Sequence, residues 1–167
     1  MFTRNDLLDI AIKMEENGKT AYDTAQKTTQ NKKLKALLQW MAQEEACHQL
    51  WFQQQKETRI QDPNSTDFAE MLPDVLQEMM GKKSLSLDEV DFSKITHTRQ
   101  MLETFIDFEN DTVLFYEFLE TFIQDKEALD GLEKIIREET AHVNKLAEML
   151  EAVDAQSLPE ETPSLRP

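Results

Sequence analysis

Two glutamates, a tyrosine and a histidine occur twice in this sequence with the same spacing. The first copy consists of Glu15, Tyr22, Glu45 and His48, and the second copy of Glu109, Tyr116, Glu139 and His142. Each residue of the second copy lies 94 positions after its counterpart in the first. Four carboxylates and two imidazoles are the ligand set of a two-metal site. The repeat therefore predicts a site for two metal ions where two related halves of the chain face each other.

The spacing inside each copy suits metal binding by a helix. In Glu-x-x-His the two side chains are three residues apart, so they share one face of a helix and lie one turn from each other. Such a pair can hold one metal ion, or the carboxylate can bridge two ions while the imidazole holds one. Carboxylate and neutral imidazole suit iron, manganese and zinc better than magnesium. Two such pairs, with one carboxylate from each of two further helices, are the general ligand pattern of di-iron and di-manganese bundles.

Charge balance supports the prediction of a two-metal site. Four ionised carboxylates inside an apolar bundle would be strongly unfavourable by themselves. Two divalent cations would balance these carboxylates, and the histidines would then bind metal in their neutral form. In the metal-free protein we expect raised carboxylate pKa values, because burial and mutual repulsion both disfavour ionisation.

Three glutamates stand next to the predicted ligands and offer a different assignment. Glu44 and Glu138 lie off the helix face that contains the histidines, so they are not expected to bind metal. Glu16 lacks the seven-residue spacing to a tyrosine that both copies share, although the choice between Glu15 and Glu16 stays open. The predicted metal ligands are Glu15, Glu45, His48, Glu109, Glu139 and His142.

Tyr22 and Tyr116 lie two turns after the first glutamate of each copy. Because helical side chains lean toward the N-terminus of their own helix, both hydroxyls are expected near the level of the metals. There they would hydrogen-bond to metal ligands from another helix, which makes them candidate catalytic residues. The alternative is a core tyrosine with a satisfied hydroxyl. Gly18 and Thr112, one turn after the same glutamates, predict either close helix packing or space for a small oxidant or water.

Four stretches with helical periodicity place the glutamates near mid-helix. The predicted helices cover about residues 6–27, 31–59, 97–124 and 126–153. Short connections join the first helix to the second and the third to the fourth, which predicts two antiparallel pairs. Asp125 is the predicted N-cap of the last helix. The sequence therefore predicts an all-α four-helix bundle.

A long crossover at about residues 60–96 is expected to join the two helix pairs. It contains Pro63 and an apolar helical patch, so short helical segments are predicted within it. Together these elements form one domain at residues 1–154. The polar tail at residues 155–167 contains Pro159, Pro163 and Pro167 and is expected to be extended and flexible.

The composition is acidic and favours helix. The 167 residues include 33 acidic and 18 basic side chains, a formal net charge of −15, and only three glycines. Such a chain repels nucleic acid and anionic membranes, so neither is an expected partner. Cys47 is the single cysteine, which excludes a disulfide within the chain and a four-cysteine metal site. Because no apolar signal segment or transmembrane run is present, a cytoplasmic location is expected.

The sequences around these residues resemble the rubrerythrin family. The similarity is carried by residues 14–22 (MEENGKTAY), 41–48 (MAQEEACH), 109–116 and 136–142 (IREETAH), and it covers about residues 6–153. The resemblance implies a ferritin-like four-helix bundle in which the six predicted ligands hold two iron ions. Manganese or zinc would be chemically acceptable substitutes. Members often form homodimers, and many reduce hydrogen peroxide or react with oxygen.

Two features depart from the rubrerythrins proper. Those proteins carry a rubredoxin domain whose iron is held by four cysteines, whereas this sequence has one cysteine, so an external electron-donor protein is expected. They also have an additional carboxylate ligand at the position of Thr112, and their peroxidase mechanism shifts iron between ligands there. The ligand set of this chain is closer to that of a bacterioferritin or a ferritin ferroxidase centre.

The resemblance therefore implies an oxidoreductase that reacts with hydrogen peroxide or oxygen and protects against oxidative stress. Two alternatives come from other classes of function. One is an iron-handling protein, and the other is a non-catalytic bundle that holds zinc or manganese.

Overall fold

The structure, a computed structural model, describes residues 4–57 and 97–157. These residues form four long helices and no strand: α1 (Arg4–Thr28), α2 (Lys32–Glu57), α4 (Thr98–Glu120) and α5 (Lys126–Ser157). The crossover predicted at residues 60–96, with its short helical segments, lies outside the described residues, as do residues 158–167 of the tail. None of the described helices is long and apolar enough to cross a membrane.

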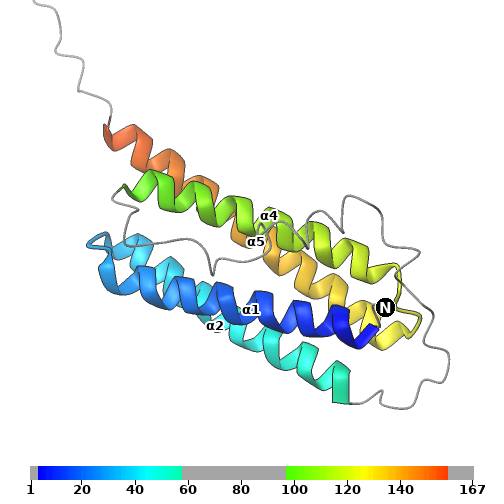
Figure 1. The fold of residues 1–167 in the computed structure, drawn as a ribbon. Helices are drawn as coiled ribbons and strands as arrows, with labels where there is room; N and C mark the ends of the chain where they lie inside the picture. The colour runs from blue at the N-terminus through cyan, green and yellow to red at the C-terminus, as the bar shows by residue number, and fades with distance from the viewer. Residues whose placement is uncertain (1–3, 58–96, 158–167) are drawn as a thin grey trace, which may run out of the picture.

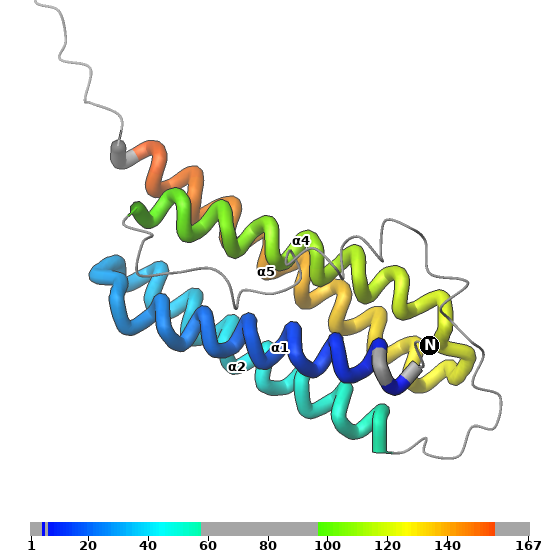
Figure 2. Tube along the Cα trace, in the orientation of Figure 1, coloured from blue at the N-terminus to red at the C-terminus, as the bar shows by residue number. Residues whose placement is uncertain are grey.

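The helices pack as two antiparallel pairs that lie against each other (Figure 1). α1 packs along α2 and α4 packs along α5, while contacts of α2 with α5 and of α1 with α4 join the pairs. The tube view in Figure 2 shows that α2 ends at the end of the bundle opposite to the start of α4. This arrangement confirms the predicted four-helix bundle.

Side-chain caps define the starts of α2 and α5. The Asn31 Oδ1 atom accepts the backbone N–H groups of Lys33 at 3.0 Å and of Leu34 at 3.1 Å. The Asp125 Oδ2 atom accepts the N–H group of Ala128 at 2.9 Å, which confirms the predicted N-cap of α5. These contacts satisfy N–H groups that the first turn of a helix leaves without an intrahelical acceptor.

Two helix ends differ from those predicted. α4 ends at Glu120 rather than near residue 124, because the N–H groups of residues 121–123 bond at 3.1 Å to carbonyls three residues earlier. Such bonds tighten the last turn and stop the α-helix. α5 continues to Ser157, past the predicted end near residue 153 and the domain boundary placed at residue 154. The first helix-breaking residue there is Pro159, which disfavours helical geometry in the residue before it.

The apolar core consists of two clusters separated along the bundle by a polar layer. The Phe115 cluster includes Leu7, Leu8, Phe52, Phe115 and Leu132. The Leu38 cluster includes Leu34, Leu38, Met41, Leu102 and Leu146. In every helix the members of the two clusters lie on opposite sides of a buried glutamate. The polar layer is therefore at mid-bundle, with apolar packing at both of its ends.

Candidate metal centre

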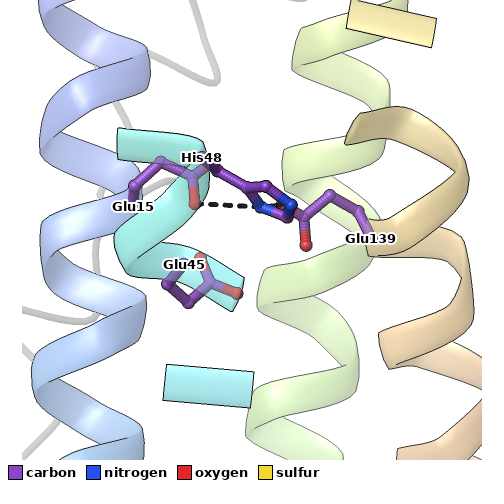
Figure 3. A group of neighbouring side chains, drawn as sticks. All are labelled: Glu15, Glu45, His48 and Glu139. Carbon is purple, nitrogen blue, oxygen red and sulfur yellow. Dashed lines mark ion pairs between the residues drawn. The ribbon is translucent and has the colours of Figure 1, made fainter. Parts of the chain in front are cut away.

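Each of the four helices contributes one buried glutamate to the polar layer. Glu15 lies on α1, Glu45 on α2, Glu109 on α4 and Glu139 on α5, and none is more than 1% exposed. His48 of α2 and His142 of α5 are buried beside them. Figure 3 shows the imidazole of His48 between Glu15 and Glu139, with Glu45 close by. The structure therefore brings together all six residues that the sequence predicts as metal ligands.

The six side chains form two overlapping groups. The His48 group contains Glu15, Glu45, His48 and Glu139, and the His142 group contains Glu45, Glu109, Glu139 and His142. Within each group, one nitrogen or oxygen atom per residue lies within 4.8 Å of the others. Glu45 and Glu139 belong to both groups, so each would be shared if both groups held a metal ion. Each of the other four residues belongs to one group only.

Many polar atoms of this layer lack a hydrogen-bond partner. The His48 Nδ1 atom is 2.7 Å from Glu139 Oε1, and the His142 Nδ1 atom is 2.8 Å from Glu139 Oε2. Despite these short distances, the angles do not meet hydrogen-bond geometry. Within the described part of the chain, every buried side-chain nitrogen or oxygen without a partner belongs to one of these six residues. Unsatisfied buried polar atoms are costly, and metal ions would satisfy them, so the residues fit a two-metal centre.

In the metal-free site, the histidines carry protons. Burial alone lowers the pKa of His48, but contacts with Glu139 and Glu15 outweigh burial and raise that pKa to about 11. Burial likewise lowers the pKa of His142, and contacts with Glu109 and Glu139 raise it to about 10. Both imidazoles are therefore positively charged at neutral pH when no metal is bound.

Three carboxylates of the metal-free site have pKa values shifted in opposite directions. Burial raises the pKa of Glu139, but contacts with His142 and His48 outweigh it and lower the pKa to about 2. Burial, followed by the charge of Glu139, raises the pKa of Glu109 to about 8 and that of Glu45 well above its ordinary value. The expectation of raised pKa values is right for Glu45 and Glu109. It is wrong for Glu139, which lies between two protonated histidines.

The two tyrosines connect the two halves of the chain at the site. Tyr22 on α1 donates a hydrogen bond to Glu109 Oε1 on α4, and Tyr116 on α4 donates one to Glu15 Oε1 on α1. Burial, followed by the adjacent carboxylate, raises the pKa of each tyrosine well above its ordinary value, so both hydroxyls remain donors. The predicted hydrogen bonds to glutamates of another helix are confirmed, and a catalytic role for these hydroxyls stays a prediction.

The glutamates next to the predicted ligands lie outside the buried layer. The side chain of Glu16 is 54% exposed and pairs with Lys13 at 3.1 Å, whereas Glu15 is fully buried. Glu44 and Glu138 are half-buried and lie with His48 in a third, shallower group of side chains. The Glu138 Oε2 atom is 3.1 Å from His48 Nε2, on the side of the ring away from Nδ1.

Sequence reasoning missed the contact of Glu138 with His48 and the position of Trp40. The ring of Trp40 meets the imidazole of His142 edge-to-face, with centroids 5.0 Å apart. A signal for Glu138 was present, because both copies read Glu-Glu-x-x-His and so place a second carboxylate beside each motif. No comparable pattern marks Trp40, because position 134, its counterpart in the second half, is a lysine.

Gly18 and Thr112 are both closely packed. A Cβ atom at Gly18 would lie 3.0 Å from Glu45 Oε2 and 3.1 Å from Phe108 Cε1. Thr112 is buried, and its hydroxyl donates to the Phe108 carbonyl at 3.0 Å. Of the two interpretations of these small residues, the structure favours close packing over open space.

The fold and the residue pattern both match known proteins. Among solved structures, a Thermotoga maritima protein described as ferritin-like and diiron-carboxylate has 25% identity and a TM-score of 0.67. The match covers 90% of this chain and 95% of that one. A hypothetical protein from Pyrococcus furiosus has the same fold, with a TM-score of 0.72, 18% identity, and coverage of 95% of this chain and 94% of that one. A search of curated proteins finds no significant match.

The sequence model of the rubrerythrin family matches residues 6–150, which is most of the chain. This chain belongs to the rubrerythrin family. Membership agrees with the ferritin-like bundle and with the buried cluster of glutamates and histidines. No rubredoxin domain is evident within the matched rubrerythrin region, in agreement with the single cysteine.

Proposed function

We propose that this rubrerythrin-family protein binds two iron ions and reduces hydrogen peroxide or oxygen with electrons from a separate donor protein. The observation that carries the proposal is the buried set of four glutamates and two histidines, whose candidate ligand atoms lie within 4.8 Å of one another in two overlapping groups. Its donor chemistry suits iron, and its family is one of di-iron proteins. Manganese and zinc suit the same donors and are the competing metals.

Each of the six side chains has a defined place in this proposal. Glu45 and Glu139 would serve both ions, because they belong to both groups. Glu15 and His48 would hold one ion, and Glu109 and His142 would hold the other. Two ferrous ions held by these residues would supply two electrons, enough with two protons to reduce hydrogen peroxide to two water molecules. A separate donor protein would supply the two electrons needed for the next turnover.

The surrounding side chains keep the ligands in place. The hydroxyls of Tyr22 and Tyr116 each fix one oxygen of a glutamate that holds a single ion. Fixed ligand orientation of this kind supports metal binding. Thr112 offers no carboxylate at the position where rubrerythrins proper have an additional one, and its hydroxyl is occupied by the Phe108 carbonyl. We therefore propose that the same six ligands serve throughout the reaction.

Anaerobic loading with ferrous iron, followed by rapid mixing with hydrogen peroxide or with oxygen, tests the proposal. We expect at least one oxidant to convert the protein-bound iron to the ferric form much faster than it oxidises ferrous iron in buffer. Glu139→Ala removes a ligand shared by both groups and should abolish the rapid phase. Glu148→Ala, at an exposed position of the same helix, should leave it unchanged.

Two results would contradict the proposal. One is wild-type protein that reacts with neither oxidant faster than free ferrous iron does. The other is elemental analysis, on protein purified without added metal, that finds zinc or manganese in place of iron. The second result would favour a non-catalytic metal bundle. Oxidation followed by rapid loss of iron to a chelator would favour iron handling.

A further inference from the structure

The two ring nitrogens of His48 have different partners. Nδ1 faces the metal centre, at 2.7 Å from Glu139 Oε1 and 3.5 Å from Glu15 Oε2. Nε2 faces away from it and lies 3.1 Å from Glu138 Oε2. If Nδ1 is to bind a metal ion, the ring proton must be on Nε2. That proton is then donated to the carboxylate of Glu138.

Glu138 is itself held in place. Its Oε1 atom is 2.9 Å from the Lys134 ammonium one turn earlier on α5, while its Oε2 atom faces His48 on α2. The carboxylate thus uses one oxygen for each partner. This arrangement fixes both the rotation of the His48 ring and the nitrogen that carries the proton.

His142 has different surroundings, although the rest of the centre repeats. The positions 94 residues before Lys134 and Glu138 are Trp40 and Glu44. Glu44 lies with His48 and Glu138 rather than against His142. The Trp40 and His142 rings pack edge-to-face, and the His142 Nε2 atom has no hydrogen-bond partner among the described residues. The two halves therefore differ in the residues near the ring of each histidine: Nε2 of His48 has a carboxylate partner, whereas Nε2 of His142 has none among the described residues.

We propose that Glu138 is a positioning residue that makes the two metal positions unequal, so that the His48 group binds its divalent cation first and more tightly. This inference rests on the proposed two-metal centre. A carboxylate behind a ligating imidazole fixes the ring and makes it a stronger donor, and loss of such a partner typically costs about 10–100-fold in metal affinity. Only the His48 group has this support within the described part of the chain.

Titration of the metal-free full chain with Co²⁺, followed by absorption and calorimetry, tests the proposal. We expect the wild type to bind two ions in two resolved steps. Glu138→Ala should weaken one of these steps by about 10–100-fold, so that the two steps merge. Glu138→Gln, which retains an acceptor oxygen, should have a smaller effect. Glu44→Ala is the matched control. It also removes a carboxylate near the His48 ring, but this carboxylate makes no hydrogen bond to the ring.

A second measurement separates positioning from loss of structure. In the Co²⁺-loaded wild type, the Nε2 proton of His48 should give a paramagnetically shifted proton resonance that exchanges slowly with water. Glu138→Ala should make it exchange faster, while the far-ultraviolet circular dichroism stays that of a helical bundle. Glu138 is half-buried and mid-helix, where alanine is the strongest helix former, so the variant is expected to fold.

Three outcomes would overturn the inference: unchanged affinities in Glu138→Ala, equal weakening of both steps, or the same loss in Glu44→Ala as in Glu138→Ala. These outcomes are distinct from failure of the proposed function. If the protein shows the predicted Co²⁺ steps but is inert toward both oxidants, the result would support the inference and contradict the proposed function. A wild type that binds fewer than two Co²⁺ ions would overturn both.

Discussion

Glu15 and Glu16 are adjacent in the chain and have opposite environments. Glu15 is fully buried and accepts the hydrogen bond of Tyr116, whereas Glu16 is at the surface beside Lys13. An exposed ion pair of this kind contributes at most about 1 kcal/mol, so Glu16 has little effect on stability or on the site. The structure therefore favours Glu15 over Glu16 as the ligand from α1.

Glu15→Ala is expected to lower metal binding from two ions per chain to one, because the His48 group loses one of its ligands. Glu16→Ala should retain two. Metal content after dialysis, measured by elemental analysis, distinguishes the two variants. Equal stoichiometry in both would show that Glu15 is not a ligand.

The spacing of the residues was sufficient to place all six side chains in one layer, because each lies on the buried face of a regular helix. Spacing could not show which partner meets the outer nitrogen of each histidine. Glu44 and Glu138 occupy equivalent sequence positions and both lie near His48, yet of the two only Glu138 is within hydrogen-bond distance of the ring in the described part of the chain. That contact depends on how α2 and α5 pack and on the neighbouring Lys134, which are tertiary features.

At the scale of the elements, Gly18 allows α1 to approach the carboxylate of Glu45 on α2. A Cβ atom there would be 3.0 Å from Glu45 Oε2, which is tighter than ordinary contact. Glu45 belongs to both groups of the centre, so displacement of this one carboxylate affects both metal positions.

Gly18→Ala is expected to weaken the binding of both ions, while the stability of the metal-free protein changes little. Alanine gains up to about 1 kcal/mol of helix propensity over glycine, which offsets the tighter contact. Gly131→Ala is the control, because its Cβ would meet Trp51, 2.7 Å away and outside the centre, and it should lower stability alone. Calorimetric metal titration and thermal unfolding measure the two effects. Unchanged metal affinity in Gly18→Ala would contradict the expectation.

The periodicity predicted the four helices, and the short connections predicted how they pair. Neither feature predicted where α4 and α5 end. The tightened turn after Glu120 is made by backbone groups and by the Thr121 hydroxyl, which donates to the Phe118 carbonyl at 2.8 Å, and no glycine or proline marks it in the sequence. The extension of α5 to Ser157 crosses a polar stretch that lacks glycine and proline. Polar composition alone therefore did not locate the end of that helix.

At the scale of the whole molecule, the polar layer divides the apolar core into the Phe115 cluster and the Leu38 cluster. Both clusters contain residues from all four helices. The helices therefore cannot move apart at the polar layer without losing apolar contacts in the two clusters. The stability of the metal-free protein therefore includes the cost of buried ionisable groups at its centre, and this cost depends on pH.

The metal-free protein is expected to lose stability as the pH rises from about 6.5 to about 8.5. The pKa values of His48 and His142 are raised from 6.5 to about 11 and about 10 on folding, so their contribution is complete below 6.5 and declines above it. The pKa of Glu109 is raised to about 8, and its effect on stability has the same direction. Its contribution to stability declines as the pH rises from 4.5 through 8. The lowered pKa of Glu139 adds stability only as the pH rises from 2 to 4.5, and nothing further in this window.

Thermal unfolding in the presence of a chelator measures this dependence. Bound metal should oppose this loss of stability at higher pH. The ligands must release their protons before they bind metal, and they do so more easily as the pH rises. The increase in Tm on metal addition should therefore be larger at about pH 8.5 than at about pH 6.5. A metal-free Tm that rises over this range would contradict the assignment of protons in the site.

The reciprocal hydrogen bonds of Tyr22 with Glu109 and of Tyr116 with Glu15 mean that neither half of the chain contains a complete centre. Two identical helical hairpins could build such a centre as a symmetric assembly, but every substitution would then appear twice. Because the two halves are covalently joined in one polypeptide, each can change alone. The chain is thus free to have Lys134 and Glu138 beside one histidine and Trp40 beside the other. In a symmetric assembly of two identical hairpins, the two metal positions would have identical surroundings. In this single chain their surroundings can differ.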